Sequence, residues 1–151
     1  MSNTGIIYGV NGPVIYLKGD SGFKISEMVY VGPEHLVGEI IGLKKGMTTV
    51  QVFEETTGLK PGDTVTGTGD AISVLLGPGI IHNIFDGIQR PLEEIAKASG
   101  KYISRGVSVD SLDTEKKWNT HITVKEGDVV GPGSVIAETK ETDSLLHKSL
   151  V

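Results

Sequence analysis

The sequence contains no cysteine, few aromatic residues and an excess of acidic over basic residues. Without cysteine the chain cannot form disulfides, thiolate metal sites or a cysteine nucleophile. Its formal net charge of −5 and the lack of a basic stripe argue against a nucleic-acid-binding protein, which needs cations to neutralise phosphates. No apolar run approaches the roughly 18 residues of a membrane span, and no signal peptide is recognisable. We therefore expect a globular protein that meets a membrane only through other proteins.

Motifs for phosphate binding, metal binding and acid–base catalysis are missing as well. The pattern Gly-x-x-x-x-Gly-Lys-Ser/Thr is absent, and Gly67-Thr68-Gly69 lacks the third glycine of a dinucleotide fingerprint. Adjacent carboxylates on a strand face opposite ways and cannot share a proton as a catalytic dyad does, so we interpret the adjacent pairs Glu54-Glu55 and Glu93-Glu94 as solvated charge. The four histidines are far apart and none has the i, i+4 spacing of a zinc site: His35, His82, His121 and His147. We therefore assign no catalytic, cofactor-binding or metal-binding residue in this chain.

Glycine, by contrast, is abundant, with 21 residues. Glycine adopts positive φ in tight turns, so this number indicates many chain reversals and hence β structure. Up to residue 68, apolar stretches of strand length alternate with turns such as Asn11-Gly12-Pro13 and Lys44-Lys45-Gly46. Short strands at this spacing are typical of a small barrel or sandwich. The predicted strands are residues 6–8, 14–17, 28–31, 36–43, 47–53 and 64–66.

One helix is predicted, over residues 91–99. Pro91 suits the first helical position, because its missing N–H would be unsatisfied there in any case. Glu93 and Glu94 fall in the first turn and Lys97 in the last, which matches the helix dipole. Gly100 then stops the helix.

Strand patterns return beyond residue 101, at residues 103–109, 121–124 and 135–137. Residues 59–65 and 124–130 share the pattern apolar-Lys-x-Gly-Asp-x-Val. We interpret this echo as recurrent turn chemistry rather than duplication, because a repeat fold needs at least three copies.

Three features have two interpretations each. Residues 86–91 form either the turn that starts the helix or a binding loop, in which Arg90 pairs with a carboxylate of a neighbouring chain. Trp118 either anchors a small core, which the sequence favours, or marks a partner surface. Lys140 follows a stretch similar to half of a biotinyl or lipoyl carrier domain, but without the carrier motifs it is better explained as an exposed strand lysine.

With these patterns in place, the sequence resembles the catalytic A subunit of archaeal and vacuolar-type (A/V-type) rotary ATPases. The resemblance spans nearly the whole chain and its motifs occur in order. The segments that carry it are Gly38-Glu39-Ile40-Ile41, residues 51–62, residues 73–79, residues 85–92, Asp113-Thr114-Glu115-Lys116-Lys117-Trp118 and residues 124–130. Residues 22–27 fit the family pattern more loosely. Residues 101–151 resemble the bulge insertion that distinguishes A subunits from B subunits and from F-type β subunits.

The resemblance implies a mainly β fold in three consecutive parts. Residues 1–70 would form an N-terminal six-stranded β-barrel, residues 71–100 a linker with the short helix 91–99, and residues 101–151 a β-rich barrel-sandwich bulge, incomplete at its C-terminal end. Implied partners are B subunits in an alternating A3B3 hexamer and central and peripheral stalk subunits. The implied location is the cytoplasmic face of a cell or vacuolar membrane, reached only through the rotary complex.

The resemblance also implies that the chemistry lies elsewhere. The family's phosphate-binding loop and catalytic residues lie further along the polypeptide, so we expect residues 1–151 to be a non-catalytic piece of a longer protein. MgATP, or ADP and phosphate, would be ligands of the full-length protein, which would couple ATP synthesis or hydrolysis to H⁺ or Na⁺ transport. The alternatives are a biotinyl- or lipoyl-like carrier modified at Lys140 and, less well supported, an oligonucleotide-binding barrel.

Overall fold

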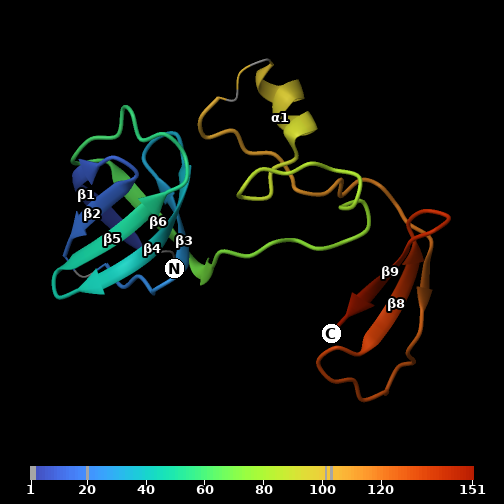
Figure 1. The fold of residues 1–151 in the computed structure, drawn as a ribbon. Helices are drawn as coiled ribbons and strands as arrows, with labels where there is room; N and C mark the ends of the chain where they lie inside the picture. The colour runs from blue at the N-terminus through green and yellow to red at the C-terminus, as the bar shows by residue number, and fades with distance from the viewer. Residues whose placement is uncertain (1–2, 20, 101, 103) are drawn as a thin grey trace. The chain divides into compact units, whose positions relative to one another are not determined.

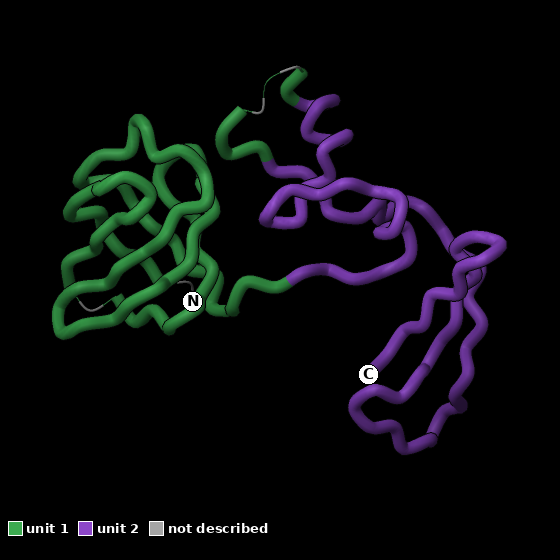
Figure 2. Tube along the Cα trace, viewed as in Figure 1, with its two compact units in different colours: residues 1–73, 99–107 green, residues 74–98, 108–151 purple. Residues whose placement is uncertain are grey.

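The computed structural model describes residues 3–19, 21–100, 102 and 104–151. The chain separates into two compact units, which Figure 2 shows in two colours. The first unit combines Met1–Ser73 with Ser99–Val107, and the second combines Val74–Ala98 with Ser108–Val151. The middle part predicted from the sequence therefore joins the second unit for most of its length, while residues 99–107 return to the first.

Six antiparallel strands of the first unit close into a barrel in the order β1-β2-β5-β4-β3-β6 (Figure 1). The mainly β fold and the six-stranded barrel are confirmed, and each strand overlaps a predicted one. The strands are β1 (Thr4–Asn11), β2 (Val14–Lys18), β3 (Glu27–Val31), β4 (Leu36–Lys44), β5 (Met47–Val52) and β6 (Thr64–Ala71). The predicted turns at Asn11-Gly12-Pro13 and Lys44-Lys45-Gly46 lie between β1 and β2 and between β4 and β5.

The barrel encloses an aliphatic core. Buried and less buried residues alternate throughout β2, β3 and β5, as a pleated strand with one face on a core requires. Side chains from all six strands meet inside, so the barrel carries a complete hydrophobic core of its own. The buried core residues are Ile7, Ile15, Leu17, Phe23, Val29, Val31, Leu36, Ile40, Val50, Val52 and Val65.

One carboxylate is buried with this core. Glu27, at the start of β3, is only 1% exposed. Its Oε2 accepts a hydrogen bond from the Lys24 N–H at 2.8 Å, and its Oε1 accepts one from the Gly69 N–H at 3.0 Å. A Cβ at Gly67 would collide with the Glu27 carboxylate and lie 2.9 Å from the Phe23 ring. Glycine at position 67 therefore leaves the space that this buried carboxylate occupies.

The predicted helix is confirmed as α1 (Leu92–Ser99) in the second unit, and it buries Ile95. It begins one residue later than predicted. Pro91 precedes the helix, and its carbonyl accepts the hydrogen bond of the Ile95 N–H at 3.0 Å. Glu94 and Lys97 form an ion pair at 2.6 Å one turn apart. Gly100, with φ of 75°, ends the helix as expected.

The second unit also contains an antiparallel sheet in the order β7-β8-β9. Its strands are β7 (Thr120–Ile122), β8 (Val135–Lys140) and β9 (Leu146–Leu150). The predicted strand over residues 103–109 is wrong for its described part, because residues 104–109 form no strand, and Ile103 lies outside the described residues. Gly106 has φ of 66° and interrupts the extended run.

The pattern shared by residues 59–65 and 124–130 forms the same type of turn in both places. The Lys60 N–H donates to Asp63 Oδ2 at 3.0 Å, and the Lys125 N–H donates to Asp128 Oδ2 at 2.8 Å. The residue before each aspartate is a glycine with φ above 90°. Only the first turn leads directly into a strand. The shared geometry supports the interpretation as recurrent turn chemistry.

Candidate functional site

The loop before α1 is closed by a single carboxylate. Asp86 Oδ1 accepts hydrogen bonds from the N–H groups of Ile88 at 3.0 Å and Arg90 at 2.9 Å. Asp86 Oδ2 accepts a further bond from Arg90 Nε at 2.8 Å. The side chains of Arg90 and Asp86 are 12% and 20% exposed. Arg90 thus has an ionic partner inside its own loop, which supports the turn interpretation of residues 86–91.

This arrangement also fixes the charge of Asp86. Burial by itself raises the pKa of the Asp86 carboxyl group. The hydrogen bonds from Arg90 and Ile88 and the charge of the guanidinium outweigh burial, so the pKa lies below the ordinary value of 3.8. The carboxylate is therefore ionised at neutral pH and available to hold the loop.

The same loop fastens an apolar segment, residues 74–84. Gln89 has φ of 62°, and its side-chain amide bonds both backbone groups of Leu75: Oε1 accepts from the N–H at 2.7 Å and Nε2 donates to the carbonyl at 2.6 Å. Five large side chains of this segment are more than half exposed: Val74, Leu75, Leu76, Ile81 and Ile84. Such a concentration of exposed apolar side chains is typical of a surface that contacts other polypeptide.

The Gly77-Pro78-Gly79 turn joins distant parts of the second unit. The Gly79 N–H donates to Glu141 Oε1, beyond β8, at 2.8 Å. A Cβ at Gly79 would lie 3.6 Å from the Trp118 ring. Trp118 is half-buried, and its open side is occupied by the Lys116 ammonium, 4.1 Å from the ring centroid. The tryptophan therefore contacts residues of its own unit, and its role as the anchor of a small core stays a prediction.

In the first unit, residues 104–107 are fastened to the loops of the barrel. The Arg105 guanidinium donates to the Thr57 carbonyl and, at 3.2 Å, to Glu34 Oε1. The Gly106 N–H donates to Glu54 Oε2 at 3.1 Å. A Cβ at Gly106 would collide with the Glu34 carbonyl oxygen. Glu54 thus has a specific structural role, whereas the sequence suggested only solvated charge.

A hollow of about 540 Å³ lies in the second unit, between α1 and residues 108–115. Carboxylates contribute much of its lining, but Asp113 already accepts hydrogen bonds from the N–H groups of Glu115 and Lys116. Among the described residues, no group of three or more histidine or acidic side chains is placed to hold a metal ion. The hollow therefore has no arrangement that indicates a particular ligand.

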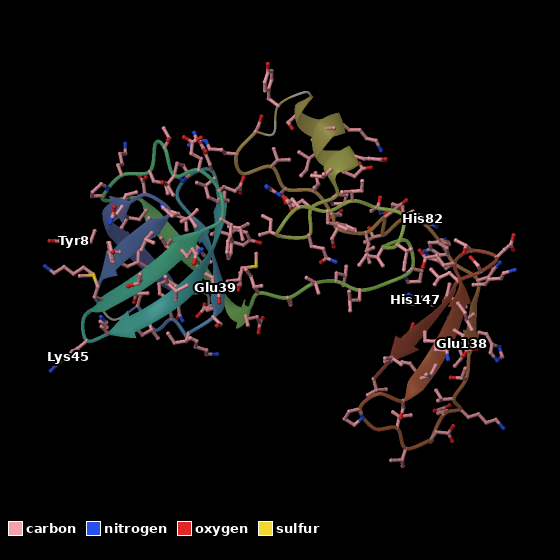
Figure 3. All side chains as sticks on the ribbon, in the orientation of Figure 1. Tyr8, Glu39, Lys45, His82, Glu138 and His147 are labelled. Carbon is pink, nitrogen blue, oxygen red and sulfur yellow. The ribbon has the colours of Figure 1, made fainter. Side chains whose placement is uncertain are left out.

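The outer surface of the barrel, here called the wall, is nearly free of charge. The wall comprises the residues of β1 to β6 that are not buried, and the structure describes all six strands in full. Its charged members are Lys18, Glu39, Lys44 and Asp70. Lys18 and Lys44 end their strands and Asp70 is the penultimate residue of β6, so Glu39 is the one charged wall residue in the middle of a strand (Figure 3). Exposed uncharged residues include Ile6, Tyr8, Tyr30, Ile41 and Leu43.

The other residues singled out from the sequence stay apart or on the surface. His35, with φ of 54°, places its ring edge-on to Tyr30 with centroids 6.2 Å apart. Lys140 ends β8, is 65% exposed and pairs with Asp143 at 2.9 Å, which fits an exposed strand lysine. None of the helices formed by the described residues is long and apolar enough to cross a bilayer.

Sequence reasoning missed the wall and the polar groups that hold the loops. The wall could have been found by reading every second residue of each predicted strand, since successive strand residues face opposite sides. Gln89 and Glu141 had no such signal, because their partners are 14 and 62 residues away.

Comparison with known proteins gives two family matches and a consistent set of relatives. Residues 7–69 match the beta-barrel domain of the ATP synthase alpha/beta family, and residues 109–151 match the barrel-sandwich domain of ATP synthase alpha/beta subunits. The V-type ATP synthase alpha chain of Halothermothrix orenii is 50% identical over 151 residues, all of this chain and 26% of that protein. The A subunit of the A-type ATP synthase of Methanopyrus kandleri is 48% identical over 153 residues, again all of this chain and 26% of that protein.

A third relative, the V-type ATP synthase alpha chain 2 of Clostridium tetani, is 50% identical over 150 residues, 99% of this chain and 25% of that protein. The chain thus spans about a quarter of the length of these relatives. The two family matches follow the order of the barrel and the second sheet and together cover more than half of the sequence. Two domains of this family match the chain, and the relatives are similar to it along the whole length of the chain. The chain therefore belongs to the ATP synthase alpha/beta family.

Proposed function

We propose that this chain is the N-terminal assembly region of the catalytic subunit of a V/A-type ATP synthase or ATPase, which couples ATP synthesis or hydrolysis to H⁺ or Na⁺ transport. The relatives are named as V-type ATP synthase alpha chains and as A subunits of A-type ATP synthases. The structural observation that carries the proposal is the low charge of the barrel wall, where charged residues lie at strand ends except for Glu39. Family membership leaves the carrier interpretation of Lys140 without support.

The wall suits contact with subunits on both sides. Because the barrel is closed, its strands have no free edge for pairing with another chain, and contacts must use side chains and loops. The central part of a protein interface is depleted in charge relative to other surfaces. In an alternating A3B3 ring each barrel meets two neighbours, so opposite faces of the wall would both be covered.

In this proposal the phosphoryl-transfer chemistry belongs to other parts of the full-length protein, where MgATP, or ADP and phosphate, would bind. The sequence of this chain has no Gly-x-x-x-x-Gly-Lys-Ser/Thr loop to cradle phosphates. The barrel contributes contacts with B subunits, and the second unit contributes contacts with the peripheral stalk. The complex holds this region at the cytoplasmic face of the membrane, without a membrane contact or a nucleic-acid partner of its own.

A scan of the wall tests the assembly role. In the full-length protein, one outward residue of each strand is changed to glutamate, and the variants are grouped in pairs that lie on opposite strands of the barrel. The pairs are Thr49→Glu with Thr66→Glu, Ile6→Glu with Ile41→Glu, and Tyr16→Glu with Met28→Glu.

The readout is the fraction of the full-length protein found in the complex with its partner subunits, measured by size-exclusion chromatography and native mass spectrometry. At least one pair should reduce assembly about tenfold or more, because a buried unpaired charge is costly in an interface. Normal assembly of all six variants, each shown by circular dichroism to be folded, would refute the proposal.

A second experiment tests the non-catalytic assignment. Calorimetry on residues 1–151 should detect no saturable ATP binding, and micromolar binding would contradict the assignment.

A further inference from the structure

Glu39 is the one charged wall residue in the middle of a strand, since the other charged wall residues, Lys18, Lys44 and Asp70, lie at or next to a strand end. It lies in the middle of β4 (Figure 3) and is half-buried. The buried residues on either side, Gly38 and Ile40, face the barrel interior. Glu39 therefore points outward, where a neighbouring subunit would lie if the wall is an interface.

The surroundings of Glu39 supply no counter-charge. Its cross-strand neighbours are Met28 on β3 and Gln51 on β5. Its neighbours on the same face of β4 are Val37 and Ile41, roughly two strand rises away. All four are uncharged, and in the part of the chain that the structure describes, the Glu39 carboxylate makes no hydrogen bond or ion pair. In the isolated barrel, water alone stabilises this charge.

Covering the wall would remove that water. A carboxylate taken out of water is stable only if it gains a cation or several hydrogen-bond donors. Gln51 is the single polar side chain beside it, and one amide cannot replace the hydration of a full charge. The compensating group must therefore come from the partner.

We infer that the β4 face of the wall docks on the barrel of a neighbouring subunit that places a basic side chain, best an arginine, against Glu39. Arginine fits because its planar guanidinium binds both carboxylate oxygens and is more weakly hydrated than an ammonium group. A row of uncharged side chains flanks the pair on both sides: Met28 on β3, and Gln51, Val14 and Asn11 on β5, β2 and β1. This inference rests on the proposed assembly role and adds the chemistry of the partner.

The experiment uses the full-length protein with B subunits alone, and measures the dissociation constant of their assembly at low and at high salt. The second unit, for which we propose contacts with the peripheral stalk, takes no part in this assembly. Glu39→Gln keeps the size of the side chain and removes its charge, and Glu39→Arg reverses the charge. Glu126→Gln is the matched control, because Glu126 is an exposed carboxylate on a turn of the second unit. Circular dichroism and thermal unfolding of each free variant establish that it folds.

We expect Glu39→Gln to weaken assembly about tenfold and Glu39→Arg to weaken it further, since truncating one partner of a buried charge pair leaves the other unpaired. The salt dependence of assembly should be smaller for Glu39→Gln than for the wild type, because the pair it removes is electrostatic. Glu126→Gln should behave as the wild type in both measurements.

The result that overturns the inference is wild-type assembly and wild-type salt dependence for both Glu39 variants. If the glutamate scan of the wall still reduces assembly in that case, the assembly role stands and only the basic partner is wrong. If the scan also has no effect, the assembly role itself fails. The two failures are therefore distinguishable.

Discussion

The two units of this chain are stabilised in different ways. The barrel has an aliphatic core from all six strands, and eleven of its hydrophobic side chains are buried together. In the second unit, the buried hydrophobic side chains among the described residues are Ile95 and Ala137, and its loops are fixed by polar contacts to Asp86, Gln89 and Glu141. A unit with a core resists local change, whereas a unit held by single hydrogen bonds depends on each of them.

The largest difference between the units should appear when a leucine is shortened. Leu17 is fully buried in the barrel, so Leu17→Ala should lower the free energy of unfolding by about 2–5 kcal/mol. Leu150, on β9, is 58% exposed, so Leu150→Ala should cost less than about 0.5 kcal/mol. Urea denaturation followed by circular dichroism measures both. Equal costs would show that the second unit buries its sheet as thoroughly as the barrel does.

A smaller effect is expected where the chain returns to the barrel at residues 104–107. Gly106→Ala forces a Cβ against the Glu34 carbonyl at a residue with φ of 66°, so it should cost more than about 1 kcal/mol. The control is Gly131→Ala, because nothing lies within 4 Å of a Cβ at that position.

Hydrogen exchange of residues 104–107 should accelerate in Gly106→Ala and stay unchanged in Gly131→Ala, since only the first substitution disturbs the contact with Glu54. If the exchange rates of the two variants were alike, residues 104–107 would not be held by the barrel loops as described. The barrel alone would then account for the stability of the first unit.

The second unit should show a distinct dependence on pH through Asp86. Its folded pKa lies below the unfolded value of about 3.9, so the stabilisation is complete above about pH 5 and is lost as the pH falls through the unfolded and then the folded value. Asp86→Asn should remove this loss below pH 4 and loosen the loop at neutral pH. An NMR titration of the Asp86 carboxyl carbon should give a midpoint below 3.8, and a midpoint above that value would contradict the contacts with Arg90.

The barrel was predictable from the sequence and the connections of the second unit were not, for a physical reason. Strands such as β4 and β5 can be predicted from the local alternation of apolar and polar residues and from the Lys44-Lys45-Gly46 turn between them. Gly100 likewise marks the end of α1. These signals lie within a few residues of the structure they specify. The contacts of Arg105 with Thr57 and Glu34 span 48 and 71 residues, and no periodic pattern encodes them.

In the candidate site, too, the local contacts were predictable from the sequence and the long-range ones were not. Local spacing suggested a turn at residues 86–91, and the Asp86–Arg90 pair is a local contact that fits it. The wall of the barrel, by contrast, is only partly local: alternation along each predicted strand gives its members, but the strand order decides which of them lie side by side. Glu39 does not stand out in the sequence, and its isolation appears once β3 and β5 are placed beside β4.

The smallest effect on the free energy of unfolding is expected at Lys140. This residue tests whether every polar contact of the second unit contributes to its stability. The Lys140–Asp143 pair is formed by side chains that are 65% and 103% exposed, in contrast to the largely buried pair of Asp86 and Arg90. An exposed pair gains little, because water and salt screen the attraction and two side chains lose freedom. Lys140→Ala should therefore change the free energy of unfolding by less than about 0.5 kcal/mol in urea denaturation, with no change on adding salt. A clearly larger loss would mean that the hairpin between β8 and β9 depends on this pair as the loop before α1 depends on Asp86.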